Sequence, residues 1–472
     1  MSVFDSDYNE DDLFEFSAKS PREEIEECKE LLRRGDIYNS VERIENTIQI
    51  CIDNELNEDG LFLANSLLEI APYNSELWIR KGLLLNALFK FEEAIDCFNH
   101  ALSLNPSDSE AIVDRSIAEE NLGLLEQAED SLRSALQMDP TNEDALYSLG
   151  IILQRKEEYK EAINFFIQVL DKDREYSEAY YELGFCYENL EEYNSALESY
   201  DSFLDYEPYS PNGWYNRGVV LVKLQRYEQA LNSYDLALSI KENFTSAWFN
   251  KGNLLTELNR FSEALECFKK AHALDMFDEE TCFNIANLYE ELGDVQQAIK
   301  YYNEAIKLND EYYEAYLSRG YCYDSTGKFQ LALKDFNKAI SLSSDNVEAW
   351  YAKADLEYSL GNLKDSVKSY LQALKIYPDN YDIWYTLAET YIEMGDWLNA
   401  LKAFSQCSRI KPEDANSMYG KAKVNFILSR TEEAIECLKI AFKLDPGIQN
   451  EFENEYPEIK SSKLFKKLLG EN

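Results

Sequence analysis

A repeat of 34 residues constrains this chain more than any other feature. Residues 214 to 221 read WYNRGVVL, and residues 248 to 255, which lie 34 positions later, read WFNKGNLL. When a frame begins at Ser75, eleven units follow one another to Ile448 without an insertion or a deletion. A period of this length is typical of stacked repeat architectures. The repeat therefore overrides the expectation of about three globular domains that the length of 472 residues alone would suggest.

Small residues recur at fixed positions of the unit. Position 8 holds Gly, Ala or Ser in all eleven units, position 20 holds Ala in ten units and Ser366 in the other, and position 27 holds Ala in eight. Helices can approach closely at such positions, and a larger side chain there would strain the packing. Apolar residues recur at helical spacing within each unit, which predicts helices over positions 1 to 14 and about 15 to 29.

Turn residues separate these helices. Position 32 holds proline in six units, and proline cannot continue the second helix. Position 15 holds glycine in five units, where a helix end favours a left-handed backbone. The five glycines are Gly123, Gly293, Gly327, Gly361 and Gly395. A single helix pair cannot bury its apolar face, whereas stacked pairs can, so the pattern predicts an all-α solenoid of antiparallel helix pairs.

The consensus of the unit resembles that of a known family. Trp or Leu at position 4, Gly or Ala at 8, Tyr at 11, Ala at 20, Phe or Tyr at 24, Ala at 27 and Pro at 32 resemble the tetratricopeptide repeat, in a multi-repeat scaffold protein of the bacterial type. The resemblance covers about four-fifths of the chain. It implies a right-handed superhelix whose concave groove is lined by the first helix of each pair, and it implies a binding scaffold.

The two ends of the chain differ from the middle. We expect residues 1–19 to form an acidic, disordered tail and residues 20–40 to form an N-terminal capping helix. Ser20, Pro21 and Glu23 predict the start of that helix, and Gly35 predicts its end. Residues 41–74 fit the frame as a degenerate repeat, residues 75–448 are the eleven units, and residues 449–472 are predicted to form a C-terminal capping helix. The lysines of its KLFKKLL segment could instead contact an acidic partner or a membrane.

Composition limits the partners and the compartment. The chain has 89 acidic and 46 basic residues, a formal charge of −43, which disfavours nucleic acid and anionic lipid and favours a basic or neutral protein partner. We find no signal-peptide pattern and no apolar run near the roughly 18 residues of a membrane helix. The nine cysteines show no CxxC spacing and recur at matching unit positions, as packing residues do. Reduced thiols and the lack of an export signal predict a cytoplasmic protein.

We predict no catalytic chemistry. The two histidines, His100 and His272, lie at positions 26 and 28 of different units, and a lone helical histidine is usually a packing or surface residue. The sequence has no phosphate-binding glycine loop and no motif with metal-ligand spacing. We therefore expect no enzyme activity, no cofactor, no metal site and no small-molecule substrate.

The predicted groove carries an unusual set of residues. Positions 5, 6 and 9 of the first helix should face it, with 2, 12 and 13 beside them. An asparagine amide both donates and accepts, so it can pair with a peptide bond of any sequence, and an adjacent aromatic ring adds contact area. The candidate peptide-binding residues are Tyr215, Asn216, Phe249, Asn250, Asn253, Phe283, Asn284 and Asn287, and the candidate acidic flank is Glu257, Glu290 and Glu291.

Two interpretations of this set stay open. The asparagines resemble the ladder by which the repeats of O-linked N-acetylglucosamine transferase hold extended peptides, but they are also common residues of the repeat family.

The sequence predicts a scaffold or adaptor that binds a protein or extended peptide, basic or neutral, in its groove. A structural or regulatory subunit that docks a folded partner through its convex face or its ends is the alternative. A non-catalytic relative of enzymes that fuse such repeats to a catalytic domain is a third hypothesis.

Overall fold

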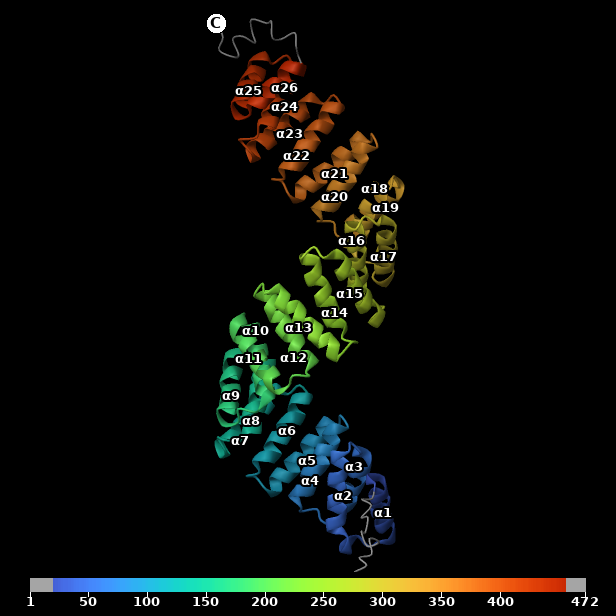
Figure 1. Ribbon diagram of the computed structural model, residues 1–472, viewed down its shortest axis with the longest axis vertical. Coiled ribbons are helices and arrows are strands. Elements are labelled where there is room, and N and C mark those ends of the chain that lie inside the picture. The colour runs from blue at the N-terminus through green and yellow to red at the C-terminus, as the bar shows by residue number, and fades with distance from the viewer. Residues whose placement is uncertain (1–19, 456–472) are drawn as a thin grey trace, which may run out of the picture. The chain divides into compact units, whose positions relative to one another are not determined.

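The computed structural model describes residues 20–455, and within that range it is built from twenty-six α-helices and one short 3₁₀ turn, with no strand (Figure 1). The chain forms two compact units, Met1–Glu242 and Asn243–Asn472, each of which is described by itself. The predicted all-α solenoid of helix pairs is confirmed. The predicted acidic tail, residues 1–19, and the KLFKKLL segment lie outside the described residues.

The first unit holds thirteen α-helices between residue 20 and its end. They are α1 (Pro21–Arg34), α2 (Val41–Asp53), α3 (Asn57–Leu68), α4 (Ser75–Ala87), α5 (Phe91–Leu104), α6 (Ser109–Asn121), α7 (Leu125–Met138), α8 (Glu143–Arg155), α9 (Tyr159–Lys172), α10 (Ser177–Asn189), α11 (Tyr193–Tyr206), α12 (Pro211–Lys223) and α13 (Tyr227–Ile240), with the 3₁₀ turn η1 (Ile37–Asn39) after α1. From α2 onward, successive helices pair off, and each pair packs on the next.

The second unit continues the same plan up to residue 455. Its helices are α14 (Thr245–Glu257), α15 (Phe261–Leu274), α16 (Glu279–Glu291), α17 (Val295–Leu308), α18 (Tyr313–Ser325), α19 (Phe329–Leu342), α20 (Val347–Ser359), α21 (Leu363–Ile376), α22 (Tyr381–Glu393), α23 (Trp397–Ile410), α24 (Ala415–Ile427), α25 (Thr431–Leu444) and α26 (Pro446–Glu455). The even-numbered helices from α14 to α24 are the first helices of their repeats, and the odd-numbered ones are the second helices.

The predicted helix boundaries are wrong by one or two residues, because the turn between the helices is longer than expected and takes up positions 14 to 16. In the eleven units the first helix covers positions 1 to 13 and the second covers 17 to 30. Position 15 has a positive φ in every repeat from residue 41 on, not only where it is glycine. The other residues there are Glu55, Phe89, Glu157, Glu191, Gln225, Asn259 and Ser429, with φ between 57° and 63°. Since this region disfavours residues with a Cβ, the packing of the helices must impose it.

The two ends of the described range are closed by additional helices. The predicted start of α1 is confirmed, because Ser20 and Glu23 form a capping box and Gly35 ends the helix in the left-handed region. The predicted C-terminal capping helix, residues 449–472, overlaps α26, but α26 begins earlier, at Pro446, which the sequence analysis took as a helix stop rather than as a first residue. Ile448 and Phe452 of α26 are buried against α24 and α25 and so cover part of the last repeat.

In most repeats the core is an aromatic ring that lies against a small residue. Position 24 is an aromatic ring in nine of the eleven units, and each of these rings is buried. A Cβ placed on Gly218 would come within 2.6 Å of Tyr234 Cε1, and one on Gly320 within 2.5 Å of Phe336 Cε1. The small residue at position 8 therefore sets how closely the two helices of a repeat can pack.

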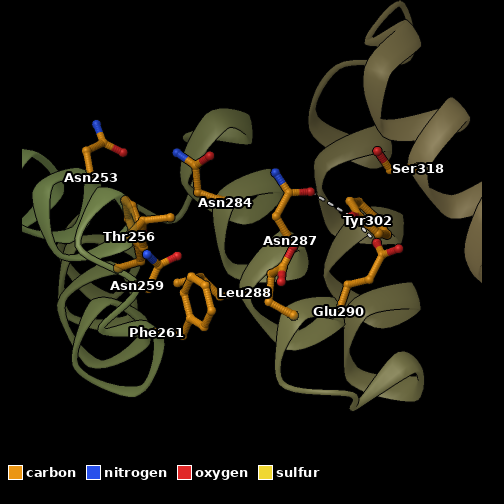
Figure 2. A pocket seen from close by; sticks show the side chains of 12 residues that line it. Asn253, Thr256, Asn259, Phe261, Asn284, Asn287, Leu288, Glu290, Tyr302 and Ser318 are labelled. Carbon is orange, nitrogen blue, oxygen red and sulfur yellow. Dashed lines mark hydrogen bonds between the residues drawn. The ribbon is translucent and has the colours of Figure 1, made fainter. Parts of the chain in front are cut away.

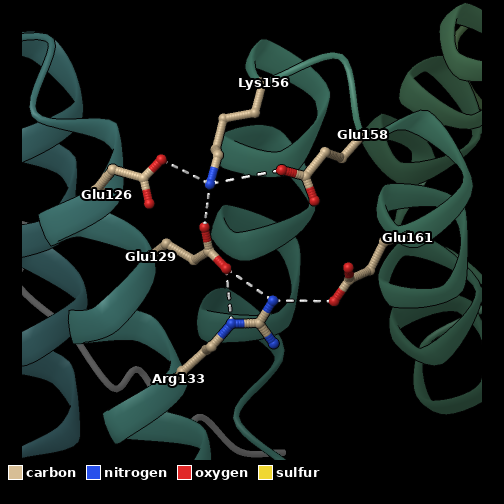
Figure 3. A network of polar contacts seen from close by, with 6 residues as sticks. All are labelled: Glu126, Glu129, Arg133, Lys156, Glu158 and Glu161. Carbon is tan, nitrogen blue, oxygen red and sulfur yellow. Dashed lines mark hydrogen bonds and ion pairs between the residues drawn. The ribbon is translucent and has the colours of Figure 1, made fainter.

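Ion pairs link neighbouring repeats on the side of the second helices. Lys156, in the turn between α8 and α9, lies 2.6 Å from Glu129 and 3.0 Å from Glu126, both on α7 (Figure 3). Glu129 also accepts from Arg133, which reaches Glu161 on α9 at 2.9 Å. The hydrogen bond from Lys156 lowers the pKa of Glu129 and keeps its carboxylate charged. The network thus connects the repeat 109–142 to the repeat 143–176.

We predict that Gly218→Leu destabilises the first unit. The added side chain would overlap the buried ring of Tyr234, which overpacks the core and should cost about 1–3 kcal/mol or more. The matched control is Asn232→Leu, an exposed position on the neighbouring helix α13, which should change stability by no more than about 0.5 kcal/mol. Chemical denaturation followed by circular dichroism measures both. Equal stability of the two variants would contradict the packing argument.

We predict that reductant does not change the melting temperature. All nine cysteines lie in the described range and are buried, and no disulfide joins any of them. Burial raises the pKa of Cys186 to about 12 and keeps its thiol neutral and unreactive. Thermal melts with and without dithiothreitol test this expectation. A drop of many degrees in the reduced sample would reveal a structural disulfide.

Candidate functional site

First helices of successive repeats contact one another in each unit and so form a shared surface. In the first unit α4 contacts α6, α6 contacts α8 and α8 contacts α10, and in the second unit α16 contacts α18 and α18 contacts α20. Side chains at positions 2, 5, 6, 9, 12 and 13 of these helices line the cavities described below. We call this the first-helix surface.

A cavity of about 510 Å³ opens on the first-helix surface of the second unit (Figure 2). Its lining residues come from the repeats that contain α14, α16 and α18, and they are Asn253, Thr256, Asn259, Phe261, Phe268, Asn284, Asn287, Leu288, Glu290, Glu291, Tyr302 and Ser318. Figure 2 shows the amides of Asn253, Asn284 and Asn287 in a row along it. Five of the eleven residues predicted from the sequence, these three asparagines with Glu290 and Glu291, therefore share one cavity.

A buried tyrosine orients part of the cavity wall. The Tyr302 hydroxyl lies 2.6 Å from Asn287 Oδ1 and 2.9 Å from Glu290 Oε2. Burial, with the nearby Glu290 carboxylate, raises the pKa of Tyr302, so the hydroxyl keeps its proton and can donate it to either oxygen. Because the Asn287 oxygen accepts from Tyr302, its amide nitrogen is the atom that can turn toward a ligand (Figure 2).

The predicted aromatic residues pack against the cores of their own repeats. The ring centre of Phe249 lies 5.5 Å from that of Phe268, and that of Phe283 lies 5.8 Å from that of Tyr302. Tyr215 lies 6.1 Å from Tyr234 in the same way. All three position-5 rings are half-buried, so each presents only an edge to solvent.

The remaining predicted residues do not line the cavity of the second unit. Asn216 belongs to the first unit, where its Nδ2 donates to the Tyr181 hydroxyl at 2.9 Å. Asn250 is half-buried on α14, and Glu257 is exposed at the last residue of that helix. Of the predicted ladder Asn216, Asn250 and Asn284, only Asn284 lines this cavity.

A second cavity, of about 570 Å³, was not singled out from the sequence. It lies on the first-helix surface of the first unit, over α6 and α8, and its lining residues are Glu110, Val113, Asp114, Ile117, Glu120, Asn142, Asp144, Tyr147, Ser148 and Ile151. Four of these are carboxylates, and the lining includes no Lys or Arg. One of the four, Glu120, pairs with Arg155 at 2.9 Å. The signal that could have found this cavity is the coincidence of acids at positions 2, 6 and 12 in adjacent units.

The carboxylates of this cavity repel one another. Burial, together with Glu110, Asp108 and Asp144, raises the pKa of Asp114 to about 6. Burial also raises the pKa of Glu120, against the opposing effect of Arg155. A cation that entered the cavity would relieve this repulsion, so its electrostatics suit a lysine or arginine side chain.

We predict that Asp114→Asn stabilises the protein at mildly alkaline pH. A carboxyl group whose pKa is raised by folding contributes stability that is present below its ordinary pKa of about 3.9 and is lost as the pH rises through about 6. The amide removes that loss, so the variant should melt higher than the wild type at about pH 8 and should gain less on acidification. Asp130→Asn, an exposed change on α7, is the control. An identical pH dependence of melting in all three proteins would contradict the assignment.

Models of the tetratricopeptide repeat family match segments along most of the described chain. Models described as "Tetratricopeptide repeat" match residues 75–108, 121–183, 177–209, 211–244, 245–275, 283–347 and 385–447, and one described as "TPR repeat" matches residues 354–395. A search of the curated proteins found no match. In the described part of the chain, no helix combines the length and the apolar character that crossing a bilayer requires.

Solved structures with similar folds include several repeat proteins. The MamA protein is 23% identical over 35% of this chain and 91% of its own, with a TM-score of 0.34. YrrB, described as a TPR protein with an unusual peptide-binding site, is 22% identical over 39% of this chain and 95% of its own, with a TM-score of 0.36. A repeat protein from Parabacteroides merdae is 23% identical over 52% and 98%, with a TM-score of 0.39. None of these likenesses indicates what this chain binds.

Proposed function

The chain belongs to the tetratricopeptide repeat family, whose repeats generally serve as non-catalytic protein-interaction scaffolds, and we propose that it binds an extended basic or neutral polypeptide segment along its first-helix surface. The proposal includes no catalytic step. The nine buried thiols, none of them in a disulfide, are in keeping with the reducing, cytoplasmic setting that we propose for it.

The observation that carries the proposal is the chemistry of the two cavities. Both open on the first-helix surface, which the resemblance to the tetratricopeptide repeat implies is the binding groove, and their lining residues include carboxylates and amides but no Lys or Arg. Their volumes lie within the range of about 300–1,000 Å³ that is usual for ligand sites. An acidic cavity favours a basic side chain, and a row of amides favours a peptide backbone.

An extended segment fits this surface better than a helix does. An extended chain leaves its own N–H and C=O groups unsatisfied, and each must find a partner when it is buried. Asn253, Asn284 and Asn287 offer both kinds of partner along the cavity of the second unit. Side chains of a bound segment that pointed into the cavity would meet Leu288 and the edge of Phe268.

We predict that the triple change Asn253, Asn284 and Asn287→Ala weakens peptide binding strongly. Each amide hydrogen bond contributes about 0.5–1.5 kcal/mol, so three lost together should reduce affinity by about 10-fold to 1,000-fold. The probe is a set of short unstructured peptides selected on the wild-type protein from a displayed random library, and calorimetry measures each against wild type and variant. The matched control is Gln296, Gln330 and Asn337→Ala, three exposed neutral residues on the second helices α17 and α19.

The outcomes separate this proposal from the alternative. Loss of binding in the first-helix variant only would support it. Loss of binding in the second-helix control only would favour a partner that docks on the opposite face. Equal affinity in all three proteins would mean that the asparagines are consensus residues of the family and do not contact the peptide. A further variant combines Glu110→Gln, Asp114→Asn and Asp144→Asn. It should bind a lysine-rich peptide more weakly than the wild type does, and its affinity should depend less on salt, because the charges that salt screens have been removed.

A further inference from the structure

Three residues of the second unit depart from the other repeats, two of them at positions that are otherwise nearly constant in character. Position 28 is His272 in one unit and Leu, Ile, Phe or Ser in the others. Position 4 is Cys282 in the next unit and Trp, Tyr, Leu, Ile or Met elsewhere. Position 26 of that same unit is Glu304, the only glutamate found at this position in the eleven units.

The repeat architecture brings these three positions together. In the last repeats, Ser408 at position 28 lies 3.8 Å from the sulfur of Met418, which is position 4 of the next unit. In the first full repeat, the ring of Trp78 at position 4 lies 4.3 Å from that of His100 at position 26 of the same unit. The three departures are therefore neighbours in space, although 32 residues separate the first from the last.

Their side chains converge with donor atoms of three kinds. His272 lies on α15, Cys282 on α16 and Glu304 on α17, and the imidazole nitrogen, the sulfur and a carboxylate oxygen all lie within 4.8 Å of one another. The Cys282 Sγ is 3.6 Å from His272 Nδ1. A tetrahedral zinc ion with a Zn–S bond of about 2.3 Å and a Zn–N bond of about 2.0 Å holds these two donors about 3.5 Å apart.

We propose that His272, Cys282 and Glu304 form a zinc(II)-binding site that joins the repeat 245–278 to the repeat 279–312. Thiolate, imidazole and carboxylate are all zinc ligands, and the combination with sulfur disfavours magnesium and calcium, which prefer oxygen donors alone. Three protein ligands leave a fourth position for water. This site departs from the sequence-based expectation of no metal, because that expectation considered spacing along the chain and not across repeats.

The three proposed ligands differ in how deeply they are buried. Cys282 is fully buried, whereas His272 and Glu304 are half-buried and leave a path for the ion. In the metal-free protein, burial raises the pKa of Cys282 to about 12, so the thiol is neutral and zinc must displace its proton. The ion would fix α16 against the second helices on both sides of it. Because α16 also carries Asn284 and Asn287, zinc would stiffen one wall of the cavity in the second unit.

The test is metal binding by the full chain, purified without a polyhistidine tag. A chromophoric zinc chelator competes with the protein in a large excess of Mg²⁺, which occupies the many exposed carboxylates. We expect one zinc per chain. Cobalt(II) in place of zinc should give a thiolate-to-cobalt charge-transfer band, and zinc should raise the melting temperature as a ligand of the folded state does.

The variants assign the ligands. His272→Leu restores the residue that most repeats hold at position 28, so this variant should fold normally. His272→Leu and Cys282→Ser should each lower the zinc affinity more than about 100-fold, because the loss of even an outer partner of a ligand lowers metal affinity about 10–100-fold. Glu304→Gln should lose less. His100→Leu and Cys322→Ala, changes at the other histidine and at another buried cysteine, should bind like the wild type.

The opposite results would overturn the site. The proposal is wrong if the wild type holds no more zinc than His272→Leu, or if the cobalt band persists in Cys282→Ser. Cys282 and His272 would then share a hydrogen bond only, with no metal site. Circular dichroism of each variant shows whether it is folded, so a loss of binding is distinguished from a loss of structure.

Discussion

The contact between the ring at position 24 and the small residue at position 8 is the constraint on which the rest of the structure depends. It fixes how closely the two helices of each repeat approach, as the near-overlap of a Cβ on Gly184 with the ring of Tyr200 illustrates, at 2.6 Å. That spacing in turn forces the three-residue turn whose position 15 is left-handed, even where it is Phe89. Once the spacing is set, the outward faces of the first helices fall in register from repeat to repeat.

The stack of repeats depends on a second, weaker link. Trp78, Trp214 and Trp384 at position 4 each donate their indole N–H to the carbonyl of the proline that ends the preceding repeat, at 2.7–2.9 Å. The hydrogen bond gives a partner to a proline carbonyl that lies beyond the end of a helix, and the indole ring packs where one repeat meets the next. The same position therefore favours a large aromatic residue, and this explains why a cysteine there stands out.

The sequence predicted the repeats, the small residues and the capping box of α1, because each depends on local spacing. It did not predict the left-handed backbone at Glu157 or Gln225, since packing between helices imposes that conformation on residues that do not favour it. It also took the aromatic rings at position 5 as groove residues. Periodicity assigns a residue to a face but does not say whether its ring turns inward, as that of Phe283 does toward Tyr302.

The candidate site also shows what sequence periodicity leaves out. The groove positions followed from helical geometry, and residues at these positions line both cavities, but the net charge of −43 does not say where on the surface the acids gather. An acid at position 2 lies in the first turn of its helix, where the helix dipole alone favours it, so a single such residue does not indicate a site. Only the structure shows Glu110 and Asp144 meeting Asp114 in one half-buried space, where their effects on its pKa add.

A repeat protein supplies its own internal comparison, because eleven copies of one unit share the same packing demands. Positions 6 and 9 are not needed for stacking and hold residues as different as Asp114, Ser148 and Asn284, so variation there is free to follow a ligand. Positions 4 and 28 are needed for stacking, so a departure there removes apolar packing and requires a compensating gain. One departure can be chance. Two polar departures that face each other at 3.6 Å, His272 and Cys282, compensate one another only through a shared proton or a shared metal ion.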